Sequence, residues 1–279
     1  MTETLDIDHL RSWIGRTDDA CERLEPELVR KFRAMFDEEP GAPQPSDPAP
    51  QMIHLCLAQP VALTQALGAD GHPARGGFLP PVPLPRRMWA GGHMTFHSDP
   101  RIGEMVRRQS RIESVEVKEG RTGTLCFVTV QHEVTADGRA VLSEKQDIVY
   151  RGLEGGSTKT AEAVPPGAHR REMVASPPLL FRYSALTFNG HRIHYDHPYV
   201  TQVEGYPGLV VHGPLQVNLL LRFATELRGK PPAFFAFRGL SPLFDNAPFF
   251  VNADETETGL KLWTSRADGP VAMSAEARW

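Results

Sequence analysis

The sequence predicts an α+β protein made of two halves, each with an antiparallel sheet curled around a helix. A helix that begins at Gly213-Pro214 carries apolar residues over most of its circumference, as a buried helix does. Runs with strand periodicity lie on both sides of it, at 113–151 and 233–279. A polar, Gly-rich stretch, 152–168, separates the two halves. We therefore expect domains at 1–151 and 169–279, joined by that linker.

The composition is typical of a globular protein and excludes several functional classes. The chain has 279 residues, of which 41% are hydrophobic and 23% charged, and this suffices for two domains with real cores. The net charge of −4 gives no support for nucleic-acid binding. Cys21, Cys56 and Cys126 are odd in number and far apart, so a reduced compartment is expected. The N-terminus lacks signal-peptide character and no apolar run reaches about 18 residues, which predicts a cytoplasmic protein without membrane contact.

The first half begins with helical patterns and continues irregularly. Residues 8–38 read as one or two helices, and 40–50 reads as a Pro-rich loop. The apolar run 53–67 is interrupted by Pro60, which predicts a short broken helix, a degraded counterpart of the central helix in the second half. Residues 76–96 are too rich in Pro and Gly for regular structure to be expected.

Strand periodicity follows. Apolar residues alternate from Glu113 to His132, Asp137-Gly138 is a hairpin turn signal, and 141–151 returns as the partner strand. The glycines in the segment GADGHPARGGF, which begins at Gly68, lack the spacing of a phosphate-binding loop.

The second half contains two helices that enclose a histidine-rich loop. Ser176 can cap a helix that starts with Pro177-Pro178, and Asn189-Gly190 can end it. The loop HRIHYDH, residues 191–197, holds three of the eleven histidines. The buried helix runs from Gly213 to about Gly229, and strands are expected at 233–239, 249–255, 260–266 and 271–279.

The loop and the second helix start resemble the MaoC-like hydratases and dehydratases, a hotdog-fold family that adds water to acyl thioesters or removes it. The usual loop of this family runs Ser-Gly-Asp-x-Asn-Pro-x-His and is followed by a His-Gly pair. Here residues 187–194 read TFNGHRIH, and His212-Gly213 matches the pair. This altered form, with RRMWAGG upstream, closely resembles a subgroup that includes the type 2 hydroxyacyl-thioester dehydratases and the mesaconyl-C4-CoA hydratases.

The resemblance implies a double hotdog whose first half is non-catalytic and helps to form the substrate pocket. It implies reversible hydration of an enoyl-CoA, with mesaconyl-C4-CoA, hydrated to citramalyl-CoA, as the first expectation. A 3-hydroxyacyl-thioester dehydratase of fatty-acid synthesis, a non-catalytic acyl-CoA-binding protein and a thioesterase remain as alternatives, because one fold can host several functions. The expected partner is the acyl-CoA itself, with CoA as substrate carrier and no further cofactor, and a homodimer stays open.

Three residues are expected to be catalytic. His194 would activate water, because its ordinary pKa lies near neutrality. Gly213 would offer an N–H at a helix start to the thioester oxygen, although the same Gly-Pro pair would serve equally as a cap. Asn189 stands where the family has Asp and cannot exchange that proton, which leaves it to hold the water or to orient His194.

Other residues are expected to bind substrate or to support the loop. His191 could supply the missing titratable partner, and Arg192 could bind a substrate carboxylate. Asp196 is expected to cap the turn that follows it. A zinc ion held by His191, His194 and His197 is not expected, because the family needs no metal. The remaining candidates for substrate or CoA binding are His212, Arg86, Arg87, Arg182, Arg222 and, with most weight, Arg238.

Overall fold

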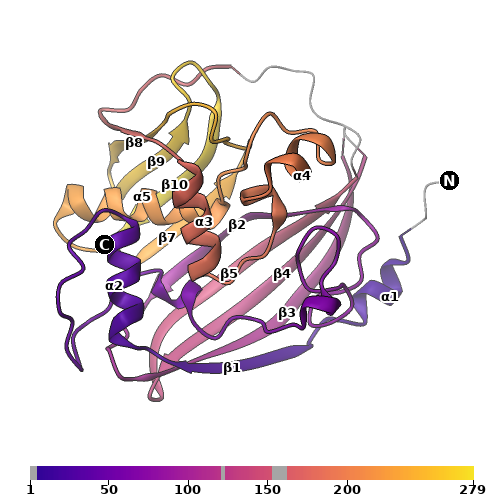
Figure 1. Ribbon diagram of the computed structural model, residues 1–279, viewed down its shortest axis with the longest axis horizontal. Helices are drawn as coiled ribbons and strands as arrows, with labels where there is room; N and C mark the ends of the chain where they lie inside the picture. The colour runs from indigo at the N-terminus through magenta and orange to yellow at the C-terminus, as the bar shows by residue number, and fades with distance from the viewer. Residues whose placement is uncertain (1–4, 121–122, 153–161) are drawn as a thin grey trace.

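One continuous antiparallel sheet organises the molecule (Figure 1). The computed structural model describes residues 5–120, 123–152 and 162–279. Within these ranges ten strands follow the order β1-β3-β4-β5-β2-β7-β10-β9-β8-β6. The first five strands of the chain thus form one side of the sheet and the last five form the other. The expected linker, 152–168, lies mostly outside the described residues.

The first half is mainly sheet, with short helices at its edges. The long strands β3, β4 and β5 pair in sequence as a meander, and β1 pairs with β3. The elements are α1 (Ile7–Arg11), β1 (Thr17–Arg23), α2 (Pro26–Met35), the 3₁₀ turns η1 (Ile53–Cys56) and η2 (Thr64–Ala66), β2 (Arg86–Phe96), β3 (Met105–Gly120), β4 (Gly123–Ala136) and β5 (Arg139–Arg151).

The second half holds the longer helices and the histidine loop. Its elements are β6 (His169–Met173), α3 (Pro177–Leu186), η3 (Arg192–His194), α4 (His197–Gln202), α5 (Gly213–Arg228), β7 (Phe234–Gly239), β8 (Phe249–Thr256), β9 (Gly259–Ser265) and β10 (Val271–Arg278). The four predicted strands after α5 are thereby confirmed.

Helix α5 is the buried centre of the second half, as predicted. Pro214 occupies its first turn, where a missing N–H costs nothing, and Gly229 ends it with φ +69°, a conformation that glycine adopts freely. Nine residues of α5 are buried, and the helix packs against β7 to β10, beside which it lies in Figure 1. The main core continues from α5 through α3 to α2, so it joins the two halves.

Strand β2 corrects the expectation that residues 76–96 would be irregular. It pairs with β5 on one side and β7 on the other, and so joins the two halves of the sheet. At Gly92 a side chain would collide with the carbonyl oxygen of Lys145, so glycine permits this close pairing. The glycines that suggested a loop therefore allow a central strand with a bulge between Trp89 and Gly91.

Three further expectations are adjusted by the structure. Residues 8–38 contain β1 between the two helices, because this polar strand gains its order by pairing with β3 rather than from apolar periodicity. β3 begins at Met105, earlier than Glu113, and β6 was not foreseen. The apolar run 53–67 forms two 3₁₀ turns instead of a helix that could match α5.

Candidate active site

The histidine loop lies between α3 and α4, whose first turns are capped as the sequence indicates, although α3 ends at Leu186 rather than at the expected Asn189-Gly190. Ser176 caps α3 by accepting a hydrogen bond from Leu179 N–H, and Asp196 caps α4 by accepting one from Tyr199 N–H at 3.1 Å. Between them Phe188 takes φ +50°, and the Asn189 side-chain oxygen accepts a hydrogen bond from His191 N–H at 3.0 Å. These contacts hold His191 to His194 in one compact turn beside the start of α5.

The structure fixes the tautomer of His194. Its Nδ1 lies 2.7 Å from the carbonyl oxygen of Val210, which can only accept a hydrogen bond, so Nδ1 carries the proton and Nε2 carries a lone pair. Burial lowers the pKa of His194 to about 4, against the opposing effect of the Val210 carbonyl. His194 is therefore neutral near pH 7 and has a basic nitrogen without a proton.

His212 supports His194 from the other side. The two rings stack with centroids 3.6 Å apart, and His212 is fully buried. Its Nε2 lies 2.8 Å from Ser184 Oγ on α3. Burial lowers the pKa of His212 well below its usual value, with a further contribution from His194. His212 thus fixes a ring plane for His194 and adds no charge.

The start of α5 offers hydrogen-bond donors beside these rings. Pro214 has no N–H and Gln216 N–H bonds His212 O, which leaves the N–H groups of Gly213 and Leu215 without a partner among the described residues. A Cβ on Gly213 would lie 3.4 Å from the Trp89 ring, so the glycine keeps this approach open. The positive end of the helix dipole adds to the attraction for a negative oxygen.

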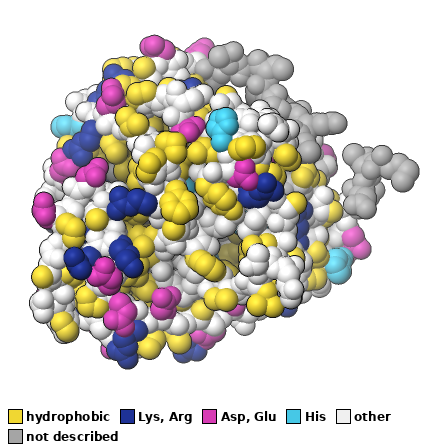
Figure 2. All heavy atoms as spheres, in the orientation of Figure 1, with side chains coloured by type: hydrophobic (Ala, Val, Ile, Leu, Met, Phe, Trp, Pro, Cys, Tyr) yellow, Lys and Arg dark blue, Asp and Glu magenta, His cyan; other side chains and the backbone are white. Residues whose placement is uncertain are grey.

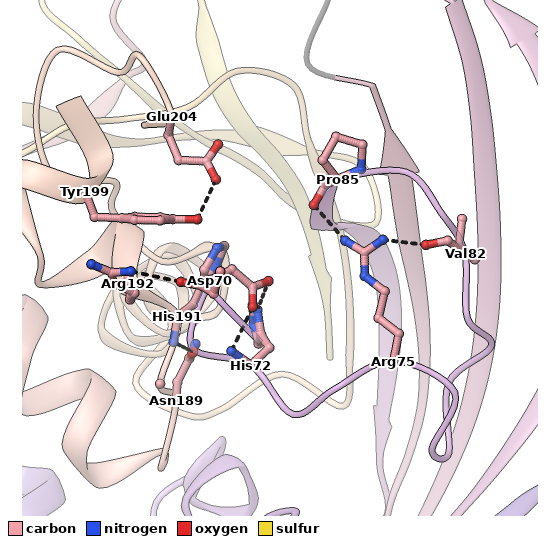
Figure 3. A network of polar contacts seen from close by, with 12 residues as sticks. Asp70, His72, Arg75, Val82, Pro85, Asn189, His191, Arg192, Tyr199 and Glu204 are labelled. Atoms are coloured by element: carbon pink, nitrogen blue, oxygen red, sulfur yellow. Dashed lines mark hydrogen bonds and ion pairs between the residues drawn. The ribbon is translucent and has the colours of Figure 1, made fainter. Parts of the chain in front are cut away.

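A segment of the first half, residues 68–75, lies against the histidine loop (Figure 3). The backbone N–H of Arg192 donates to Asp70 O at 2.9 Å, and its guanidinium donates to Ala69 O at 3.0 Å. The ring of His72 lies 4.2 Å from the ring of His191, centroid to centroid. Burial lowers the pKa of His191 to about 2, helped by His72 and His194. Two distant parts of the chain thus meet at the site.

A cavity of about 730 Å³ opens beside these groups. Asn189, Gly190, Pro214 and His72 line it, whereas His191, His194 and His212 are not among its lining residues. The face of the molecule that Figure 2 shows is hollowed near its centre, with hydrophobic side chains around the hollow. The cavity is large enough for an acyl group with part of a carrier arm.

The opposite wall of the cavity is charged. Glu144 on β5 is buried and lies 3.4 Å from His54, and His132 is its neighbour across the strand pair. Burial alone would raise the pKa of Glu144, but His54 and His132 lower it below its usual value. Burial lowers the pKa of His132. A long unbranched alkyl chain would therefore meet a carboxylate and two imidazoles in this space.

The arginines expected at the site separate into two groups. Arg192 bonds Asp196 at 2.7 Å and stacks on Tyr199, and Arg238 is exposed on β7 at the seam with β2. Neither lines the cavity. Arg87 does line it, and no carboxylate pairs with Arg87 within the part of the chain that the structure describes. Its neighbour Arg86, by contrast, pairs with Glu204 at 3.4 Å.

The potential metal ligands differ from those weighed in the sequence. His197 is exposed at the start of α4, so His191, His194 and His197 do not converge. Donor atoms of Asp70, His72 and His191 instead lie within 4.8 Å of one another, and within this group the Asp70 carboxylate is hydrogen-bonded to His72 Nδ1. Sequence reasoning missed Asp70 and His72, although the Asp-x-His spacing inside a Gly-rich loop was visible.

This fold and site define a class of protein. A sheet that continues through two halves, one of them wrapped on a buried helix with a histidine loop at its start, is the arrangement of a double-hotdog hydratase or dehydratase. A Mycobacterium tuberculosis protein described as having a double hotdog fold superposes with a TM-score of 0.54 over 95% of this chain and 96% of its own, at 12% identity. HtdX of the same organism superposes with a TM-score of 0.68 over 94% and 99%, at 19% identity.

Sequence comparison gives the family. Residues 52–245 match the family model of hydroxyacyl-thioester dehydratase type 2. Mesaconyl-C(4)-CoA hydratase of Chloroflexus aurantiacus is 44% identical over 275 residues, which cover 95% of each chain. The chain therefore belongs to the type 2 hydroxyacyl-thioester dehydratase family and is a hydro-lyase with the hotdog fold. No helix in the described ranges is long and apolar enough to cross a membrane.

Proposed function

We propose that this protein hydrates a short, carboxylate-bearing enoyl-CoA, with mesaconyl-C4-CoA as substrate and citramalyl-CoA as product. The observation that carries the proposal is the pairing of a proton-free His194 Nε2 with the free N–H groups at the start of α5. Hydration needs both a base for water and donors for the thioester oxygen. The high identity to a mesaconyl-C(4)-CoA hydratase supports the choice of acyl group.

In this proposal His194 Nε2 takes a proton from water while the water oxygen attacks the β-carbon. The electrons of the double bond move onto the thioester oxygen, where the N–H groups of Gly213 and Leu215 stabilise the negative charge. Asn189 holds the water through its side-chain nitrogen, because its oxygen is occupied by His191 N–H. A proton at the α-carbon completes the product. Addition of water changes no net oxidation state, so CoA enters only as the carrier of the acyl group.

Arg87 is the residue we propose for the substrate carboxylate, in place of Arg192 and Arg238. It lines the cavity on β2, opposite Tyr150 in the strand pairing. Its positive charge is one of the causes of the lowered pKa values of His72 and His191, after burial and other charged groups, and like His72 it lines the cavity. A charge-assisted bond of this kind contributes about 1.5–3 kcal/mol. In mesaconyl-C4-CoA the carboxylate sits on the carbon that receives the hydroxyl, so one anchor also orients the reacting carbon.

A second candidate is dehydration of a longer 3-hydroxyacyl thioester. The cavity volume of about 730 Å³ favours it, since a five-carbon acyl group alone would leave much of that space empty. The charged wall around Glu144 argues against a plain alkyl chain there. We therefore rank the carboxylate-bearing substrate first.

A panel of enoyl-CoA esters tests the proposal. The expected result is a mass gain of one water on mesaconyl-C4-CoA, with kcat/KM about 10-fold or more above that for crotonyl-CoA. His194→Ala should lower kcat by about 10²- to 10⁴-fold without loss of folding. Equal or better turnover of crotonyl-CoA or a longer enoyl-CoA would favour the second candidate. Release of free CoA thiol would instead indicate a thioesterase.

A further inference from the structure

The backbone of segment 68–75 lies directly against the backbone of the histidine loop. Gly71 has φ +88°, and a side chain there would collide with the carbonyl oxygen of Gly190. In return, a Cβ on Gly190 would lie 2.6 Å from the carbonyl oxygen of Gly71. Two glycines thus let the two backbones touch, and the residue on each side of Gly71 is presented to the site.

Those two residues form a carboxylate–imidazole pair (Figure 3). Asp70 Oδ2 lies 3.0 Å from His72 Nδ1, and Asp70 Oδ1 accepts the backbone N–H of His72 at 3.0 Å. Burial would raise the pKa of Asp70, but the bonds to His72 lower it well below its usual range. A carboxylate accepts only, so His72 Nδ1 carries the proton, and Nε2, which has no hydrogen-bond partner among the described residues, belongs to a ring that lines the cavity.

The histidine loop lacks the group that this pair provides. Asn189 replaces the usual carboxyl group and cannot exchange a proton, and the base His194 is held by a carbonyl rather than a carboxylate. His72 lines the cavity and has a carboxylate partner. Among the histidines in the described ranges that meet both conditions, it lies nearest to the histidine loop. The second proton of the reaction needs such a group.

We propose that His72 is a second catalytic residue, supplied by the first half of the chain, and that Asp70 is its positioning residue. The inference rests on the hydration proposed above. In hydration His72 takes a proton from solvent at its unprotonated Nε2, and the resulting imidazolium gives that proton to the α-carbon as the enolate collapses, while His194 takes a proton from the attacking water. His194 then releases its proton to solvent, so the net change is addition of one water. In dehydration the same atoms move in reverse.

The surroundings of His72 determine its pH dependence. Burial lowers its pKa, Asp70 raises it, and the charges of Arg87 and Arg75 lower it. His191 lies against its other face. Hydration then requires His72 protonated and His194 neutral, which gives a bell-shaped profile whose alkaline limb belongs to His72. Removing the Asp70 charge should move that limb to lower pH.

The test compares His72→Gln and Asp70→Asn with His97→Gln. His97 is a matched control because its ring also bonds a side chain, Ser143 Oγ at 2.9 Å, outside the site. Expected are a kcat loss of about 100-fold or more for H72Q, a smaller loss with an alkaline limb moved to lower pH for D70N, and no change for H97Q. Thermal melting of each variant checks folding, and the limb shift in D70N keeps the test decisive should H72Q fold poorly.

Three outcomes would overturn the inference, and they are distinguishable. If the unmodified protein is active and the kcat of H72Q is within twofold of its kcat, His72 is not a catalytic residue. An alkaline limb that does not move in D70N would lead to the same conclusion, and in both cases the proposed function would stand. Activity lost on dialysis against a chelator and restored by Zn²⁺ would make Asp70 and His72 metal ligands instead of a proton-transfer pair. A parent protein that hydrates no ester of the panel would overturn the proposed function, and this inference with it.

Discussion

The role that a single residue can play in this site depends on the hydrogen bonds that its side chain already makes. Arg192 looked suited to a carboxylate from its place in the loop, yet Asp196, Ala69 O and the Tyr199 ring occupy its guanidinium. Arg87 lay in a stretch that predicted no regular structure, yet strand β2 directs it into the cavity. The sequence names candidate donors, but only the partners of each atom show which donor is free for a substrate.

This contrast gives a paired prediction for the two arginines. Arg87→Met should lower kcat/KM for mesaconyl-C4-CoA by about 10- to 150-fold while changing crotonyl-CoA turnover much less, because only the first substrate has a carboxylate. Arg192→Leu, the matched control, should weaken both substrates alike by loosening the loop. Steady-state kinetics on the two esters measures both ratios. If Arg192→Leu, and not Arg87→Met, lost the preference for mesaconyl-C4-CoA over crotonyl-CoA, Arg192 would be the residue that binds the carboxylate.

At the scale of elements, locally coded features could be predicted and long-range ones could not. Helix α5 begins at Gly213 and stops before Gly229 as the sequence predicts, and α3 begins after Ser176 as predicted. The end of α3 was predicted less well: the helix stops at Leu186, before the expected Asn189-Gly190, and Phe188 takes the left-handed conformation. Strand β1 is polar and gains order from its pairing with β3, and β2 is ordered by partners at least 46 residues away in β5 and at least 139 residues away in β7. The role of the Asp70–His72 pair could not be predicted for the same reason, because the pair reaches the histidine loop only through the contact between Gly71 and Gly190.

That contact can be tested by glycine replacement. Gly71 and Gly76 both have φ +88°, but a Cβ on Gly76 would meet its nearest atom, in Pro81, at 3.6 Å, whereas one on Gly71 collides with Gly190. Either change to Ala should cost about 1–2 kcal/mol in backbone strain. Gly71→Ala should also displace the segment and lower kcat on the order of 100-fold. Urea unfolding and kcat are measured for both variants, so that the effect of the Gly71–Gly190 contact is separated from that of backbone strain. If the two variants have equal kcat, the segment can be displaced without loss of activity.

The whole molecule joins two unequal halves through one sheet. We propose 1–151 and 169–279 as its units, since each contributes five strands and only the second wraps its strands on a long helix. The first half has 3₁₀ turns where the second has α5, and this difference leaves room for the cavity beside its strands. The cavity therefore lies against the first-half strands, where these short turns rather than a long helix stand beside it.

Burying several neutral histidines in one molecule has a consequence for its stability. Burial lowers the pKa of His194 to about 4, and it also lowers the pKa values of His72, His132, His191 and His212. In the unfolded chain these groups titrate near 6.5. Between those values the unfolded state binds protons that the folded state does not, so the free energy of unfolding falls as the pH falls. The contribution of these histidines is complete above about pH 6.5 and is lost toward pH 4.

We therefore predict that acidification from pH 7.5 to 4.5 destabilises the protein steeply, before most carboxylates titrate. Each proton taken up only by the unfolded chain contributes about 1.4 kcal/mol per pH unit to the slope. Urea unfolding at pH steps across this range measures it. His191→Gln removes one such group and should flatten the slope by about one proton, whereas His97→Gln, whose ring is bonded to Ser143 at the surface, should leave it unchanged. A free energy of unfolding that stays constant or rises as the pH falls would show that these histidines are protonated in the folded protein.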